Sequence, residues 1–132
     1  MATDKDTFKM NTMQKNKLIA EFMGFELNDK DQYYVPNLGS FEDFLLQFHN
    51  NWNWLMKVVE KIESLGYFLM AYEFEDDEKN EKSGEFWAQI SDKLLIDINS
   101  LINLTGQPSK LVATYTAVVE FIKWYNQQEK LK

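Results

Sequence analysis

Carboxylates are the chemically active side chains that this sequence concentrates most, since seven of its 21 acids lie between Glu73 and Glu85, together with two lysines. A pair of carboxylates can hydrolyse a glycosidic bond, but one of them needs a raised pKa, which requires burial. The segment "EDDEKNEKSG", residues 75–84, is instead typical of a solvated loop. Two interpretations stay open: a solubilising loop, or an acidic patch that docks on a basic protein surface with electrostatic steering of the encounter.

The single histidine, His49, lacks the partners that metal binding or nucleophilic catalysis would need. The chain has no cysteine and no second histidine, so a metal site would have to combine His49 with carboxylates such as Glu42 and Asp43. A surface or helix-capping role fits His49 better. A G-x-S-x-G motif and a phosphate-binding glycine loop are both missing. We therefore predict a protein that is not an enzyme and that uses no metal and no cofactor.

Aromatic residues are the other excess, with four tryptophans and six tyrosines. They could stack on bases, but such platforms accompany a basic groove, and this chain is acidic. Core packing at helical spacing explains most of them, and a tryptophan at a protein interface is the main alternative. The candidate partner-binding residues are the acids of the loop and its two aromatic flanks: Tyr72, Glu75, Asp76, Asp77, Glu78, Glu81 and Trp87.

The charge balance narrows the class of partner. The net charge is −7, and all 14 basic residues are lysines, so guanidinium groups for bidentate capture of phosphate or guanine are missing. Generic binding to nucleic acid is therefore not expected. We predict no membrane association, because no run of about 18 apolar residues is present. The polar N-terminus and the lack of cysteine favour the cytoplasm. The oligomeric state stays open.

Length and composition predict one domain. The chain has 132 residues, of which 45% are hydrophobic, and it contains no linker rich in Pro, Gly or Ser. We expect a single domain over residues 1–132, with a flexible N-terminus over 1–11 and a flexible acidic loop over 75–84.

Hydrophobic periodicity predicts a helix over about 12–23, stopped by Gly24, and a strand at "DQYYVP" that Pro36 ends. The segment "SFEDFLLQFH", residues 40–49, favours a short helix or helical turn. There Ser40 with Asp43 resembles a capping box, and the apolar residues keep helical spacing.

A long helix is predicted to begin at "NNWNW", with Asn50 or Asn51 as its N-cap, and to end at Gly66. One apolar row comprises Trp52, Leu55, Met56, Val59 and Ile62, and a second comprises Trp54, Val58 and Leu65. This spacing predicts that Trp52 is a core residue. Its replacement would cost about 3–5 kcal/mol if the side chain is fully buried.

The second half of the chain predicts a hairpin and a last helix. "YFLMAYEF", 67–74, and "EFWAQIS", 85–91, are typical of strands joined by the acidic loop. Residues 92–104 are either a strand, as the alternation of Leu94, Ile96 and Ile98 favours, or a broken helix. The last helix spans about 107–130 with Pro108 near its first turn. Its expected inward residues are Leu111, Tyr115, Val118, Phe121, Ile122 and Tyr125.

The order of these elements predicts an α+β fold: a small, mainly antiparallel sheet of three to four strands, packed by two long helices and one or two shorter ones.

Three segments resemble a family of small proteins from Bacteroidota phages and prophages, whose domain is described as a phage α-β-α sandwich. They are "NKLIAEFMGFEL" (16–27), "FHNNWNWLMKVVEKIESLGY" (48–67) and "AVVEFIKWYNQQ" (117–128). They cover roughly a third of the chain and are packing motifs. The family more usually has proline where Lys57 stands, and residues 68–111 show no resemblance.

The resemblance implies an accessory protein in the cytoplasm of the bacterial host cell. Its expected partner is a host protein, and an anti-defence inhibitor is the most concrete form. An example is an anti-CRISPR protein acting on an effector with a basic nucleic-acid groove. The alternatives are a sponge-like binder of a nucleotide or other small molecule, and a structural or self-associating phage component.

Overall fold

The computed structural model describes residues 10–76, 81–92 and 102–130. It is an α+β fold with small antiparallel sheets of two and three strands, which confirms the predicted fold class. The chain divides into two compact units, Met1–Gln47 and Phe48–Lys132, which are described separately below. The single domain over 1–132 stays a prediction.

The first unit begins with helix α2, Thr12–Phe22, as the sequence predicts. Asn11 caps it: its side chain accepts from the backbone N–H of Gln14, whose own side chain accepts from the backbone N–H of Asn11. This reciprocal pair satisfies two amides that the helix leaves without partners. Gly24, with a φ of 76°, follows the C-terminal end of the helix.

A two-stranded hairpin follows, with strand β1, Gln32–Val35, antiparallel to strand β2, Gly39–Glu42. The Leu38 backbone N–H donates to the Val35 carbonyl at 3.0 Å and closes a four-residue turn. Pro36 and Asn37 are its central residues, and Asn37 has a φ of 70°. Proline followed by a residue of positive φ is the signature of a type II turn.

The prediction of a short helix or helical turn over 40–49 is confirmed only in part, as a helical turn that begins after the hairpin. Residues up to Glu42 belong to β2, and only a 3₁₀ turn, η1 (Asp43–Leu45), is helical. Glu42 rather than Ser40 precedes this turn, and no side chain caps it. The turn at Pro36 brings the following residues back against β1, and this pairing overrides the helical spacing of the phenylalanines.

The second unit begins with its best-formed helix, α3, Trp52–Ser64. Asn51 is the N-cap, and its side chain accepts from the backbone N–H of Asn53 at 2.9 Å. Gly66, with a φ of 101°, follows the last turn. Both ends agree with the sequence prediction.

Three strands form an antiparallel sheet in the order β3-β4-β5: β3 is Tyr67–Asp76, β4 is Glu81–Asp92 and β5 is Ile102–Gln107. The predicted hairpin is confirmed by the pairing of β3 with β4. Residues 75–76 and 81–84, predicted as loop, continue these strands. The alternation expected over 94–98 falls outside the described residues.

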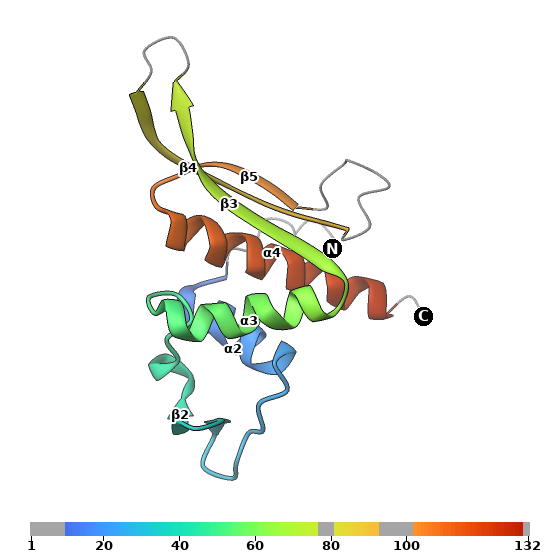
Figure 1. Ribbon diagram of the computed structural model, residues 1–132. Coiled ribbons are helices and arrows are strands. Elements are labelled where there is room, and N and C mark those ends of the chain that lie inside the picture. The colour runs from blue at the N-terminus through green and yellow to red at the C-terminus, as the bar shows by residue number, and fades with distance from the viewer. Residues whose placement is uncertain (1–9, 77–80, 93–101, 131–132) are drawn as a thin grey trace. The chain divides into compact units, whose positions relative to one another are not determined.

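Helix α4, Lys110–Lys130, completes the unit. Ser109 caps it, since its Oγ accepts from the Val112 N–H at 3.0 Å, so Pro108 lies before the helix and not within its first turn. Figure 1 shows α3 and α4 on the same side of the sheet. The inward face of α4 agrees with the prediction at Tyr115, Val118, Phe121 and Ile122, whereas Leu111 and Tyr125 are only half-buried.

An aromatic cluster joins the start of β3 to α4. The rings of Tyr67 and Phe121 meet at 4.9 Å between centroids, and Tyr67 and Trp124 meet at 5.9 Å, both edge-on. Edge-on contacts place the positive rim of one ring against the negative face of the other. This cluster holds the beginning of β3 in place against α4.

Two tyrosines with raised pKa values make the folded protein less stable at alkaline pH. Burial raises the pKa of Tyr115 well above its ordinary value of 10.0. The pKa of Tyr33 is also raised, first by burial and then by the negative charges of Glu21 and Asp43. The folded state therefore retains protons that the unfolded chain releases near pH 10, so stability falls as the pH rises above about 10.

Tyr115→Phe should remove part of this decline. Between about pH 9 and about pH 11, we expect the Tm of this variant to fall less than the Tm of the unsubstituted protein. Thermal unfolding monitored by circular dichroism measures the Tm at each pH. Tyr125→Phe, a half-buried position on the same helix, controls for the loss of a hydroxyl. An unchanged slope in Tyr115→Phe would contradict the assignment.

Candidate functional site

The face of the sheet that points away from α3 and α4 carries exposed apolar side chains. Along β3, Phe68, Met70 and Tyr72 are exposed, whereas the alternate residues Leu69 and Ala71 lie on the side of the helices. Side chains of one strand alternate between the two faces of a sheet. We call the exposed set, with Trp87 of β4, the outer face.

Tyr72 and Trp87 are direct cross-strand partners on this outer face. Their ring centroids are 5.7 Å apart with a tilt of 44° between the ring planes. Tyr72 is 38% exposed and Trp87 is half-buried. The pair is an aromatic surface that is accessible from solvent, and tyrosine and tryptophan are residue types typical of protein-binding hot spots.

Three of the acids predicted to bind a partner belong to the same two strands as this pair, further along the hairpin. The pairing of β4 with β5 ends at Phe86 and Gln107, so β3 and β4 continue beyond that point as two strands only. Figure 1 shows them extending past α4. We call residues 73–85 the acidic hairpin end. Glu75 and Asp76 are in β3 and Glu81 is in β4, whereas Asp77 and Glu78 lie outside the described residues.

The strand register sets which charged residues of the acidic hairpin end are opposite one another. Glu75 is opposite Lys82, but Asp76 is opposite Glu81. Like charges at directly opposite positions destabilise a strand pair.

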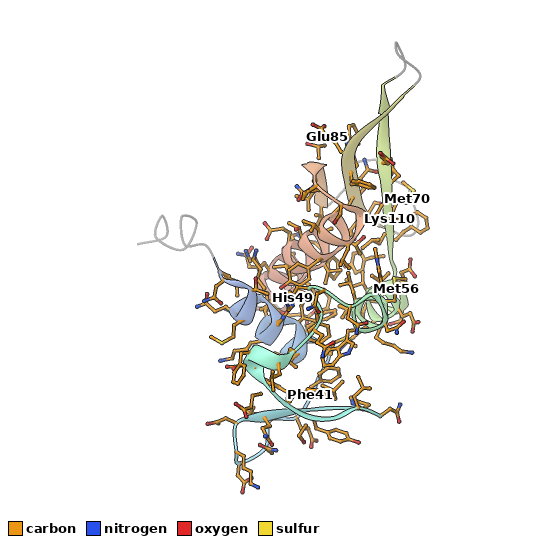
Figure 2. All side chains as sticks on the ribbon, turned by 90° about the vertical axis from the view of Figure 1, so that its left-hand side faces the viewer. Phe41, His49, Met56, Met70, Glu85 and Lys110 are labelled. Atoms are coloured by element: carbon orange, nitrogen blue, oxygen red, sulfur yellow. The ribbon has the colours of Figure 1, made fainter. Side chains whose placement is uncertain are left out.

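A groove lies on the other side of the sheet, with a volume of about 600 Å³. One wall is a row along α3: Trp52, Met56, Val59 and Glu63. Leu69 and Ala71 of β3 line its floor. Lys110 and Thr114, from the first turns of α4, complete it. Figure 2 labels Met56 and Lys110, from the two helices that line the groove, and Met70 of the outer face.

The groove corrects the predicted packing of α3. The side chains of Leu55, Val58 and Ile62 are fully buried, but Trp52 and Met56 are 39% and 43% exposed. Leu65, predicted on the second apolar row, is also exposed. The apolar surface of α3 is wider than the part of it that the core covers. The uncovered apolar side chains, Trp52 and Met56, line the groove. The sequence contains one sign that this row is not fully buried. Glu63 continues the helical spacing of Trp52, Met56 and Val59, and a charged side chain is not expected on a core face.

His49 is not the helix cap, a role that Asn51 takes. Its ring lies half-buried and edge-on to Tyr115, with 6.3 Å between centroids. Within residues 10–76, 81–92 and 102–130, no group of three or more His, Asp or Glu side chains is arranged to hold a metal ion. No helix in that part of the chain is long and apolar enough to cross a membrane.

Comparison of the chain with models of protein families, with curated proteins and with solved structures gives no significant match. The function must therefore be argued from the outer face, the acidic hairpin end and the groove themselves.

Proposed function

We propose that this protein is a non-enzymatic interaction protein that binds a basic surface of another protein through its acidic hairpin end and outer face. The observation that carries the proposal is the exposed Tyr72–Trp87 pair, which lies on the same two strands that carry Glu75, Asp76 and Glu81 further along the hairpin. Aromatic anchors supply binding energy, and the neighbouring acids select a partner of opposite charge.

The charge distribution supports this division of roles. Residues 73–85 carry seven acids and two lysines, a net charge of −5 within a chain of −7. A concentrated charge raises the rate of encounter with an oppositely charged surface, and the effect weakens as salt is added. A partner that brings lysines or arginines would neutralise part of this concentrated negative charge.

The finer form of the proposal names the setting. The protein is a phage- or prophage-encoded accessory protein in the cytoplasm of the bacterial host, and its partner is a host protein. An anti-defence inhibitor, for example an anti-CRISPR protein, fits best, because the effectors of such systems hold nucleic acid in basic grooves. The resemblance of residues 16–27, 48–67 and 117–128 to phage proteins, together with the acidity, supports this form.

Reversal of the predicted acids tests the proposal. A variant with Lys at positions 75, 76, 77, 78 and 81 should no longer capture a basic nucleic-acid-binding protein from nuclease-treated host lysate, whereas the unsubstituted chain should. The expected cause is local repulsion between the new lysines and the basic partner. Captured proteins are identified by mass spectrometry, and Tm is measured in parallel to show that the variant is folded.

The matched control reverses five exposed acids elsewhere: Glu26, Asp29, Glu42, Glu60 and Glu129. Both variants change the net charge by the same amount, so only the place of the charges differs. We expect the control to capture the same protein as the unsubstituted chain. Equal capture by both variants would show that the acidic hairpin end is not the binding site.

A further inference from the structure

The groove carries two charged side chains at opposite ends. Gln107, the last residue of β5, pairs with Phe86 of β4, and Phe86 pairs with Glu73 of β3. Helix α4 begins three residues after Gln107, so its first residue, Lys110, lies beside this end of the sheet. Helix α3 ends at Ser64, three residues before β3 starts at Tyr67, so Glu63 lies at the opposite end. The apolar part of the groove therefore runs between a cation and an acid.

Lys110 is placed to receive an anion. It is the first residue of a 21-residue helix, and its side chain is exposed. Within the described ranges it takes part in no ion pair. The partial positive charge at the N-terminus of α4 adds to that of the ammonium group. The acid Glu63 repels an anion at the other end, so the charges define one orientation for a bound molecule.

The middle of the groove is apolar and partly open. Trp52 and Met56 leave much of their surface uncovered, and Val59, Leu69 and Ala71 supply further apolar contacts. From Trp52 to Glu63 the row spans 11 residues, which corresponds to about 16 Å along the helix axis. A volume of about 600 Å³ is within the range of small-molecule sites in proteins.

We propose that this groove binds a small amphiphile with one apolar body and a single anionic group. The anionic group pairs with Lys110, and the body lies on Trp52 and Met56. A single negative charge is required because one lysine lines the groove and the whole chain carries −7, which repels polyanions such as nucleoside triphosphates. This function is independent of partner binding, which uses the opposite face of the sheet.

Two fluorescent probes test the proposal: 8-anilinonaphthalene-1-sulfonate, an aromatic monoanion, and N-phenyl-1-naphthylamine, a neutral molecule of similar shape. We expect saturable binding of the anionic probe at one site. Lys110→Glu should weaken its affinity about tenfold or more, because an attraction becomes a repulsion. The affinity of the neutral probe should not change, since its contacts with the groove are apolar.

Lys57→Glu is the matched control, because Lys57 is an exposed lysine of α3 that does not line the groove. It makes the same change in net charge and should leave both affinities unchanged. Met56→Ser, on the groove wall, should weaken both probes, whereas Tyr72→Ser, on the outer face, should weaken neither.

Three results would overturn the proposal. The first is an equal effect of Lys110→Glu and Lys57→Glu on the anionic probe. The second is loss of the signal in Tyr72→Ser, which would place the probe on the outer face. The third is displacement of the anionic probe by ATP at lower concentrations than by laurate, which would identify a nucleotide site. Since none of these assays includes the protein partner, they succeed or fail separately from the capture experiment.

Discussion

Trp54→Ala should destabilise the protein by about 3–5 kcal/mol, and Trp52→Ala by roughly half as much. Trp54 is 7% exposed and meets Phe48 edge-on, with 5.3 Å between ring centroids. Its removal transfers a large apolar area to water, leaves a cavity and breaks an aromatic pair. Trp52 is 39% exposed, so less area is involved and the vacated space is open to solvent.

Urea denaturation monitored by far-ultraviolet circular dichroism measures the free energy of unfolding of both variants without depending on tryptophan fluorescence. A domain of this size is stable by about 5–15 kcal/mol, so Trp54→Ala can remove much of the folded population. Trp54→Phe should recover part of the loss, because the ring contact with Phe48 is kept. An equal cost for the two alanine variants would show that Trp52 is a core residue after all.

Tyr72→Ala and Trp87→Ala should each weaken binding of the captured partner by about 30-fold or more, which corresponds to about 2 kcal/mol of binding free energy. The two rings are in contact, so the double variant should lose less than the sum of the single losses. Tyr72 is about as exposed as Trp52 and contacts Trp87, so Tyr72→Ala should also cost about 1–2 kcal/mol of stability, and affinity is compared at a temperature at which the variant is folded. Affinity is measured by titration calorimetry with the purified partner.

Tyr34→Ala is the control for this pair, since Tyr34 is an exposed tyrosine in β1, outside the unit that contains the outer face. It should not alter the affinity. Unchanged affinity in Tyr72→Ala and Trp87→Ala would leave the acids as the sole determinants of binding and remove the aromatic pair from the site. The charge reversal at the acidic hairpin end tests the acids separately.

Local signals were sufficient to predict most elements of the fold. Asn51 and Gly66 mark the ends of α3 because capping and positive φ are properties of a few consecutive residues. The prediction of a short helix or helical turn over 40–49 was right only for the 3₁₀ turn at Asp43–Leu45, because pairing with β1, initiated by the turn at Pro36, outweighed helical spacing up to Glu42. Secondary structure follows local pattern unless a non-local contact satisfies the backbone better.

The two sites differ in how far the sequence could predict them. Tyr72 and Trp87 flank the acidic segment in the sequence, so they could be proposed together, and the register of the hairpin brings them into contact. The groove combines Trp52 with Lys110, which are far apart in the chain and meet through the sheet and the two helices. Periodicity along one helix cannot reveal such a neighbour, and it assigned Trp52 to the core instead.

The alternation along β3 restricts how this strand can change in evolution. Leu69 and Ala71 line the groove, while Met70 and Tyr72 belong to the outer face. Substitutions alter one surface at a time, but insertion of one residue would shift the register and exchange the two sets, because the side-chain period of a strand is two. Apolar side chains would leave the floor of the groove, and a bulky tyrosine would enter it. Length variation in this hairpin should therefore be confined to the part beyond Glu73, where the register already shifts between Glu73 and Glu75.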